Sequence, residues 1–234
     1  MEFLSNKYFL IALTFLIFLG AKVLQKRTGL ALLNPILISI IAIIGVLLAS
    51  DIDYEAYHEG GEYIEFWLKP AIVALGVPLY RQLETIKKQI VPLLLAELIG
   101  CVAGILSVIV VADLFGATKE VILSLVPKAV TTPIAMEISS TIGGIPSLTA
   151  AVVVCTGIFG AMAGFKMVKL SRISSPMACG LSIGTASHAV GTASAIERSE
   201  RYGAFSSLGL ILNGLLSAIL TPVILELIGY QSAV

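Results

Sequence analysis

This 234-residue sequence has little charge. Only 13% of its residues are charged, and fifteen acidic residues balance fifteen basic ones. A soluble domain usually carries about 25% charged residues, and a nucleic-acid-binding domain adds a basic patch. The scarcity and the balance of charge together exclude an ordinary soluble domain and argue against a nucleic-acid partner.

Histidine and cysteine are also scarce. The two histidines, His58 and His188, stand far apart, and the three cysteines each fall alone in an apolar segment. These spacings fit neither a metal site nor a disulfide framework. No phosphate-binding loop or dinucleotide fingerprint is present. Ser187 and His188 are adjacent, so their side chains diverge and do not pair as nucleophile and base. We therefore expect no enzyme activity and no cofactor.

Hydrophobic residues make up 57% of the chain and cluster in runs near membrane-spanning length, roughly 20 residues. This pattern predicts an all-α, multi-pass protein of the cell (inner/plasma) membrane. No long polar linker interrupts it, so we expect a single membrane domain over residues 1–234. The six expected full spans are Tyr8–Ala21, Leu30–Ser50, Trp67–Tyr80, Ile90–Ala112, Ser147–Val168 and Phe205–Ile228.

The distribution of basic residues predicts the orientation. The segment Lys22–Gly29 holds three basic residues, whereas Asp51–Phe66 holds none and is rich in acids. Basic loops stay in the cytoplasm. We therefore place Lys22–Gly29 inside and interpret Asp51–Phe66 as a solvated outer loop. Residues 1–66 are the expected scaffold spans, and residues 67–234 the expected transport region.

Two segments do not fit an ordinary membrane helix. Pro127–Pro146 combines internal prolines, threonines and two charges, and Pro176–Glu197 is rich in Gly, Ser and Thr in its middle. Irregular backbone at membrane depth survives only where protein or water covers it. The basic residues of 166–172 reach the cytoplasm only if the first segment turns back. We predict two opposed re-entrant or broken-helix hairpins, over about 120–145 and 176–197.

The sequence also suggests an internal repeat. Residues 77–101 and 132–155 share two prolines and a final cysteine at similar spacing, with one gap. Pro176–Glu197 followed by Phe205–Ile228 repeats the order of a broken segment and then a span. Such repeats are common in secondary transporters, whose sites form where broken helices meet near the bilayer midplane.

The tips of the two hairpins are predicted to enclose a binding site. A charge at the bilayer centre costs about 2.5–3.5 kcal/mol on insertion scales, so ionisable residues there are functional candidates. An ammonium, hydroxyls and unpaired backbone donors suit a small organic anion. The coupling ion, H+ or Na+, is left open, with His188 a candidate proton carrier. The candidate binding residues are Lys128, Thr131, Thr132, Pro133, Thr185, Ser187, His188 and Thr192.

Structural interpretations of the same residues stand beside the functional ones. In one interpretation Lys128 forms an ion pair with Glu137 or Glu97 inside the helix bundle. Each of these acids is either a charge that takes part in ion coupling or a structural charge. His188 packs as an imidazole bonded to a carbonyl group. The threonines satisfy backbone groups freed by Pro and Gly. Asn213 joins neighbouring helices rather than binding a ligand.

The segments VPKAVTTPIAMEISSTIGGIPSLTA and GLSIGTASHAVGTASAIE, with NPILISI and KPAIVALGVPLYRQL, resemble the LrgB/CidB family of membrane proteins. The resemblance runs from about residue 30 to 230. Family members are described as holin-like or antiholin-like and are linked to murein hydrolase control and lysis. The family is similar to the C-terminal half of the plastidal glycolate/glycerate translocator, and bacterial members are tied to pyruvate uptake.

Two functions follow as expectations from the residues and the resemblance. The first is transport of small monocarboxylates, such as pyruvate, glycolate or glycerate, by alternating access between the hairpins. The alternative is a holin/antiholin-type pore or a regulator of murein hydrolase activity. The resemblance also implies a small LrgA/CidA-type membrane partner, and the short scaffold favours a homodimer.

Overall fold

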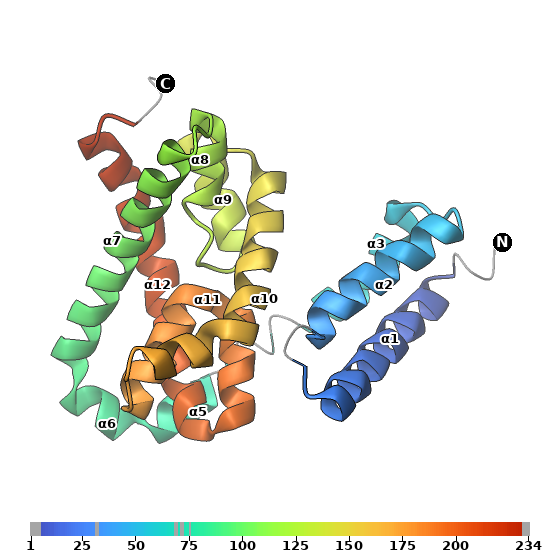
Figure 1. Ribbon diagram of the computed structural model, residues 1–234, viewed down its shortest axis with the longest axis horizontal. Coiled ribbons are helices and arrows are strands. Elements are labelled where there is room, and N and C mark those ends of the chain that lie inside the picture. The colour runs from blue at the N-terminus through green and yellow to red at the C-terminus, as the bar shows by residue number, and fades with distance from the viewer. Residues whose placement is uncertain (1–5, 31–32, 68–69, 71–72, 75, 231–234) are drawn as a thin grey trace. The chain divides into compact units, whose positions relative to one another are not determined.

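The computed structural model describes residues 6–30, 33–67, 70, 73–74 and 76–230. These residues are almost entirely helical and contain no strand. The helices separate into two compact units, Met1–Leu75 and Gly76–Val234. Figure 1 draws the helices of both units. The prediction of an all-α membrane protein is confirmed.

The described residues of the first unit include three helices, and local capping chemistry explains where they begin and end. The Asn6 side chain accepts a hydrogen bond from the Tyr8 amide at 2.9 Å, and Asn34 accepts from the Ile36 amide at 2.9 Å. Asparagine is a favoured N-cap, because its oxygen satisfies an amide that has no helical partner. The first helix ends where Gly29 takes a left-handed φ of 67°. The helices are α1 (Lys7–Thr28), α2 (Pro35–Ala49) and α3 (Tyr54–Glu65).

The interpretation of Asp51–Phe66 as a loop is wrong, because its middle forms helix α3. This helix packs along α1: Tyr57 and Thr14 share a hydrogen bond of 3.1 Å between their hydroxyls. A Cβ at Gly60 would lie 3.0 Å from the carbonyl oxygen of Lys7, so the helices approach closely. The less exposed residues of the segment recur at three- and four-residue spacing, as at Tyr57, Gly60 and Ile64, and this makes the helix amphipathic. The many acids of the segment conceal that pattern. Its described acids are exposed, as expected.

Among the described residues, four helices are long and apolar enough to cross a membrane, and α2 is a shorter apolar helix. They correspond to five of the six expected spans. The third, Trp67–Tyr80, lies partly outside the described residues, and its described C-terminal end belongs to α5. The long helices of the second unit are α7 (Ile90–Leu114), α10 (Pro146–Leu170) and α12 (Glu200–Leu227), preceded by the short α5 (Gly76–Arg81) and α6 (Leu83–Lys88).

The first predicted hairpin is formed by α8 (Lys119–Leu125) and α9 (Thr132–Ile142), with a non-helical tip between them. After α9 the chain returns to α8. The Ile145 amide donates to Ser124 Oγ at 2.7 Å, and Thr149 Oγ1 donates to the Ser124 carbonyl at 2.9 Å. Because the chain leaves beside the helix by which it entered, the segment is re-entrant. We call residues 119–142 hairpin 1.

The second predicted hairpin is α11 (Pro176–Arg198), which breaks at His188. There φ is 43° and ψ is −142°, which no helix permits. A Cβ at Gly191 would lie 3.2 Å from the carbonyl oxygen of Ile183. Eight residues of continuous helix would separate such positions by about 12 Å along the axis. The chain therefore turns back at His188, and we call α11 hairpin 2.

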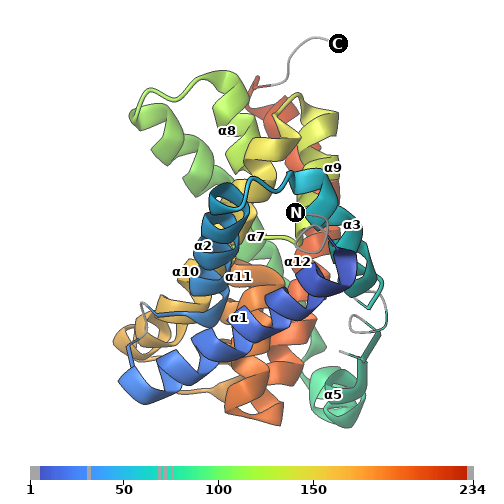
Figure 2. The ribbon, with the colours of Figure 1, turned by 90° about the vertical axis from the view of Figure 1, so that its right-hand side faces the viewer.

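The two hairpins approach from opposite ends of the second unit. Hairpin 1 follows the end of α7, and hairpin 2 follows the opposite end of the unit, where α10 finishes (Figures 1 and 2). This arrangement agrees with the predicted pair of opposed hairpins. A hairpin followed by a long helix occurs twice, as α8–α9 then α10, and as α11 then α12. The two aligned cysteines differ, because Cys101 is buried and Cys155 is exposed.

Candidate functional site

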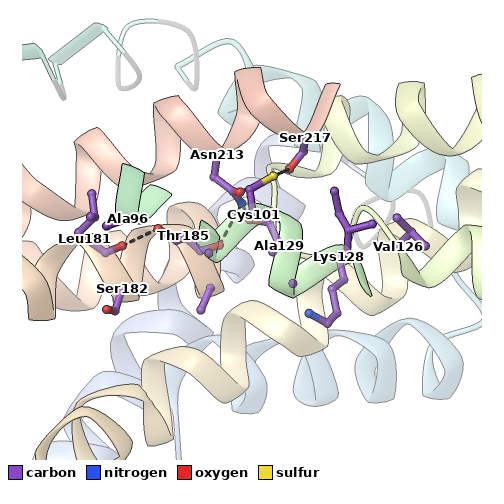
Figure 3. A pocket seen from close by; sticks show the side chains of 14 residues that line it. Ala96, Cys101, Val126, Lys128, Ala129, Leu181, Ser182, Thr185, Asn213 and Ser217 are labelled. Carbon is purple, nitrogen blue, oxygen red and sulfur yellow. Dashed lines mark hydrogen bonds between the residues drawn. The ribbon is translucent and has the colours of Figure 1, made fainter. Parts of the chain in front are cut away.

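A cavity of about 290 Å³ lies where the tip of hairpin 1 meets hairpin 2, α7 and α12 (Figure 3). We call it the central cavity. Its walls are partly small residues of α7, including Gly100 and Gly104. Small residues leave room for a ligand between closely packed helices. The polar or sulfur-bearing residues of its lining are Cys101, Lys128, Ser182, Thr185, Asn213 and Ser217.

Asn213 of α12 joins the two hairpins. Its Nδ2 donates to the carbonyl oxygen of Ala129 at 3.1 Å and to that of Thr185 at 3.0 Å. Its Oδ1 accepts from Ser217 Oγ at 3.4 Å. An amide offers two N–H donors, so one side chain satisfies a carbonyl from each broken segment. The interpretation of Asn213 as a link between elements agrees with these contacts, although the residue also lines the cavity.

Lys128 sits at the tip of hairpin 1, half-buried. In the part of the chain that the structure describes, no carboxylate lies within ion-pair distance of its ammonium group. Glu137 is exposed on α9, and Glu97 bonds elsewhere. Neither of the two pairings considered from the sequence is therefore formed. A lysine without a protein counter-charge in such surroundings is suited to an anionic ligand.

Glu97 is buried inside α7, with 1% of its surface exposed. Its Oε2 lies 2.7 Å from Thr185 Oγ1 of hairpin 2. Its Oε1 is buried and has no hydrogen-bond partner among the described residues. Glu97 therefore links α7 to hairpin 2 through a single hydrogen bond.

A second cavity, of about 560 Å³, lies between hairpin 2 and α10. Lys128 and Ser182 line both this cavity and the central one, and Ser187 lines the second alone. The helix α10 comes so close that a Cβ at Gly160 would overlap the Ser187 side chain. Lys128 thus stands at the junction of two cavities.

The remaining candidates serve the backbone or lie away from the cavities. His188 Nε2 is 2.8 Å from the carbonyl oxygen of Val153, which matches the packed-imidazole interpretation. Thr192 Oγ1 donates to the carbonyl oxygen of His188 at 2.9 Å. Neither residue lines a described cavity. Thr131, Thr132 and Pro133 begin α9 and also lie outside both linings.

Three polar or sulfur-bearing residues in the lining of the central cavity were not among the sequence candidates: Ser182, Cys101 and Ser217. Each lies three or four positions from a candidate on the same helix, namely Thr185, Glu97 or Asn213. Residues at these spacings share a helix face. Helical spacing around the candidates was therefore a usable signal.

Comparison with known proteins identifies the family. The model of the LrgB-like family matches residues 14–227. The chain belongs to the LrgB-like family. Holin-like protein CidB of Staphylococcus epidermidis is 36% identical over 93% of this chain and 95% of its own length. Its counterpart in Staphylococcus aureus and the uncharacterized protein YxaC of Bacillus subtilis are each 37% identical over the same shares. No solved structure matches the chain.

Membership agrees with the resemblance expected from the motifs, and with the long apolar helices it identifies a multi-pass membrane protein. The relatives' names support the holin-like alternative and say nothing of monocarboxylates. The geometry of the LrgB-like chain must therefore carry any argument for transport.

Proposed function

We propose that this LrgB-like protein is a carrier of small organic anions, with monocarboxylates such as pyruvate, glycolate and glycerate as the substrate class. The observation behind the proposal is Lys128, which has no protein carboxylate in reach among the described residues and stands at the junction of two cavities. Holding a cation among apolar helices is costly unless an opposite charge compensates it. A bound carboxylate supplies that charge.

The opposed hairpins supply the route. Transporters with discontinuous helices bind substrate near the midplane and move one part against another to open each side in turn. Here Ser182 and Lys128 border both cavities, so a substrate passes between them without leaving these groups. Asn213 links the hairpin tips, so opening one side changes the contacts of the other.

The partners follow from the same proposal. The carrier needs no cofactor and catalyses no reaction, and its driving ion is H+ or Na+. A homodimer and a small LrgA/CidA-type membrane protein are the proposed protein partners. Phe159 and Met167, at the edge of the second cavity, are 59% and 54% exposed and offer apolar surface to such a neighbour or to lipid.

A second candidate is a holin-like pore or a regulator of murein hydrolase activity. It is favoured by the names of the CidB relatives. A pore has no need of a lysine held without a counter-charge, so the two candidates differ in what Lys128 does.

Uptake of labelled pyruvate into proteoliposomes tests the proposal. Saturable uptake, inhibited by glycolate and glycerate, is expected for the unaltered chain. Lys128→Ala should reduce uptake at least about tenfold, since it removes the half-buried charge that pairs with the anion. The control is Lys119→Ala, an exposed lysine at the start of α8. Uptake that does not saturate, or that survives Lys128→Ala in a folded protein, would favour the pore.

A further inference from the structure

A hydroxyl beside the central cavity has more hydrogen-bond acceptors than protons. Thr185 Oγ1 lies 2.7 Å from Glu97 Oε2 and 2.8 Å from the carbonyl oxygen of Leu181. A threonine hydroxyl carries one proton, whereas a carbonyl oxygen and an ionised carboxylate only accept. Threonines in helices commonly donate to the carbonyl one turn back, as Thr185 does to Leu181. Both contacts are full hydrogen bonds at the same time only if Glu97 supplies the proton of the second one.

The burial of Glu97 leads to the same conclusion. The residue is 1% exposed, and within the described part of the chain its Oε1 has no partner. An ionised carboxylate here would hold its charge with a single hydrogen bond, and an uncompensated buried charge is strongly unfavourable. A protonated acid leaves only a neutral carbonyl oxygen unpaired, which is far less unfavourable. The neutral form is therefore the one that fits.

The ionisable groups around Glu97 do not neutralise it by contact. Cys101, one turn along α7, shares a hydrogen bond with α12, and His188 of α11 bonds to α10. Lys128 lines the central cavity from hairpin 1 without forming an ion pair with any described residue. The other charged side chains of α6, α7, α8, α11 and α12 are exposed, namely Glu84, Lys87, Lys88, Asp113, Lys119, Glu120, Glu197, Arg198, Glu200, Arg201 and Glu226.

We propose that Glu97 is a proton-binding site of the carrier, protonated while hairpin 2 rests on α7 and deprotonated when Thr185 moves away. This inference rests on the proposed function. The bound carboxylate supplies the negative charge that Lys128 lacks among the described residues. When hairpin 2 moves off α7 to release the anion, Glu97 gives up its proton, so anion and proton travel together.

The contacts provide the link between the two events. Thr185 bonds to Glu97 through its hydroxyl and to Asn213 through its carbonyl oxygen. Asn213 also holds Ala129, the neighbour of Lys128. A movement of hairpin 1 around a bound anion is thereby transmitted to the group that holds the proton.

Infrared spectroscopy of the purified full chain tests the proton site without reference to transport. At neutral pH the unaltered protein should show the carbonyl stretch of a protonated carboxylic acid, and Glu97→Gln should remove it. Glu226→Gln, which alters an exposed carboxylate of α12, is the matched control and should keep the band. A spectrum without the band, or a band that survives Glu97→Gln, would overturn the proposal.

Proteoliposomes test the coupling. The amide that Glu97→Gln introduces would donate to Thr185 as the protonated acid does, so counterflow of labelled against unlabelled pyruvate should persist within about twofold. Accumulation driven by a pH gradient should fall at least about tenfold, because the residue no longer exchanges a proton. Accumulation that persists, or a loss of counterflow together with it, would overturn the coupling. Unaltered protein that shows the infrared band but moves no pyruvate would instead overturn the proposed function, and the coupling with it.

Discussion

At the scale of single residues, the site depends on donors and acceptors that match one by one. Asn213 illustrates this, because its Nδ2 donates to two carbonyl oxygens, those of Ala129 and Thr185. Its burial, with 2% of its surface exposed, means that water does not replace either bond. The chemistry of the amide, and not its shape alone, holds the hairpin tips together.

Asn213→Asp therefore tests the link between the hairpins. A carboxylate of the same shape has no donor and would face both carbonyl oxygens. Leaving two buried acceptors unpaired should lower the free energy of unfolding by about 1–3 kcal/mol for each and abolish pyruvate uptake. Thermal unfolding in detergent and proteoliposome uptake measure the two effects.

The chain contains a matched control in Asn34, which is also buried. Its side-chain oxygen only accepts, from the amides of Ile36 and Leu37 at the start of α2. Asn34→Asp keeps that oxygen and places a negative charge at a helix N-terminus, which is favourable. Equal damage from both substitutions would show that the donor bonds of Asn213 are not what holds the tips.

The sequence predicted some residues of this site but not the hydrogen-bond partner of each residue. Lys128 and Thr185 were predicted because charge and hydroxyls are rare in apolar segments, and both line the central cavity. His188 was chosen for the same reason, yet its ring bonds to the carbonyl oxygen of Val153. A polar residue in an apolar segment is a good functional candidate, but only the three-dimensional structure shows whether it contacts a cavity or the backbone.

At the scale of helices and hairpins, the breaks in helices were the feature that the sequence predicted best. Prolines and glycines signalled both hairpins, and the basic residues of 166–172 indicated that the first turns back. In contrast, α3 was missed because its acids suggested a solvated loop, while the helix is held by contacts with α1 such as Tyr57 to Thr14. A contact between distant segments leaves no local signal.

The turn of hairpin 2 is made by a residue poorly suited to it. His188 adopts a φ of 43° with a ψ of −142°, a combination that costs a side-chain-bearing residue about 1–3 kcal/mol. His188→Gly relieves that cost and loses the bond to Val153, whereas His188→Ala loses the bond and keeps the cost. The glycine variant should therefore be more stable than the alanine variant by about 1 kcal/mol or more. Thermal unfolding of the two purified variants compares them directly.

The sign of the stability difference between His188→Gly and His188→Ala distinguishes a turn at His188 from a regular helix. Inside a regular helix, glycine is less stable than alanine by roughly 0.5–1 kcal/mol. A straight or smoothly kinked α11 would give that ordinary order. An alanine variant more stable than the glycine variant would therefore contradict the re-entrant turn at His188.

At the scale of the whole molecule, the question is whether the second unit opens as a continuous channel or one side at a time. The packing favours the latter. Close approaches such as Gly184 against the Ser206 backbone, and Gly160 against Ser187, fix hairpin 2 between α10 and α12. Elements packed at this density move between discrete arrangements rather than parting to leave a hole.

A comparison of charged and uncharged solutes of similar size tests this last point. A carrier that exposes Lys128 to one side at a time should exchange pyruvate across the membrane. The permeability of its liposomes to neutral solutes the size of glycerol should be no higher than that of liposomes without protein. It should also show labelled pyruvate uptake stimulated by unlabelled pyruvate inside, because the loaded site returns faster than a site that must re-form its charge balance. Release of a neutral solute at a rate that rises with protein content, unaffected by Lys128→Ala, would instead support the holin-like alternative.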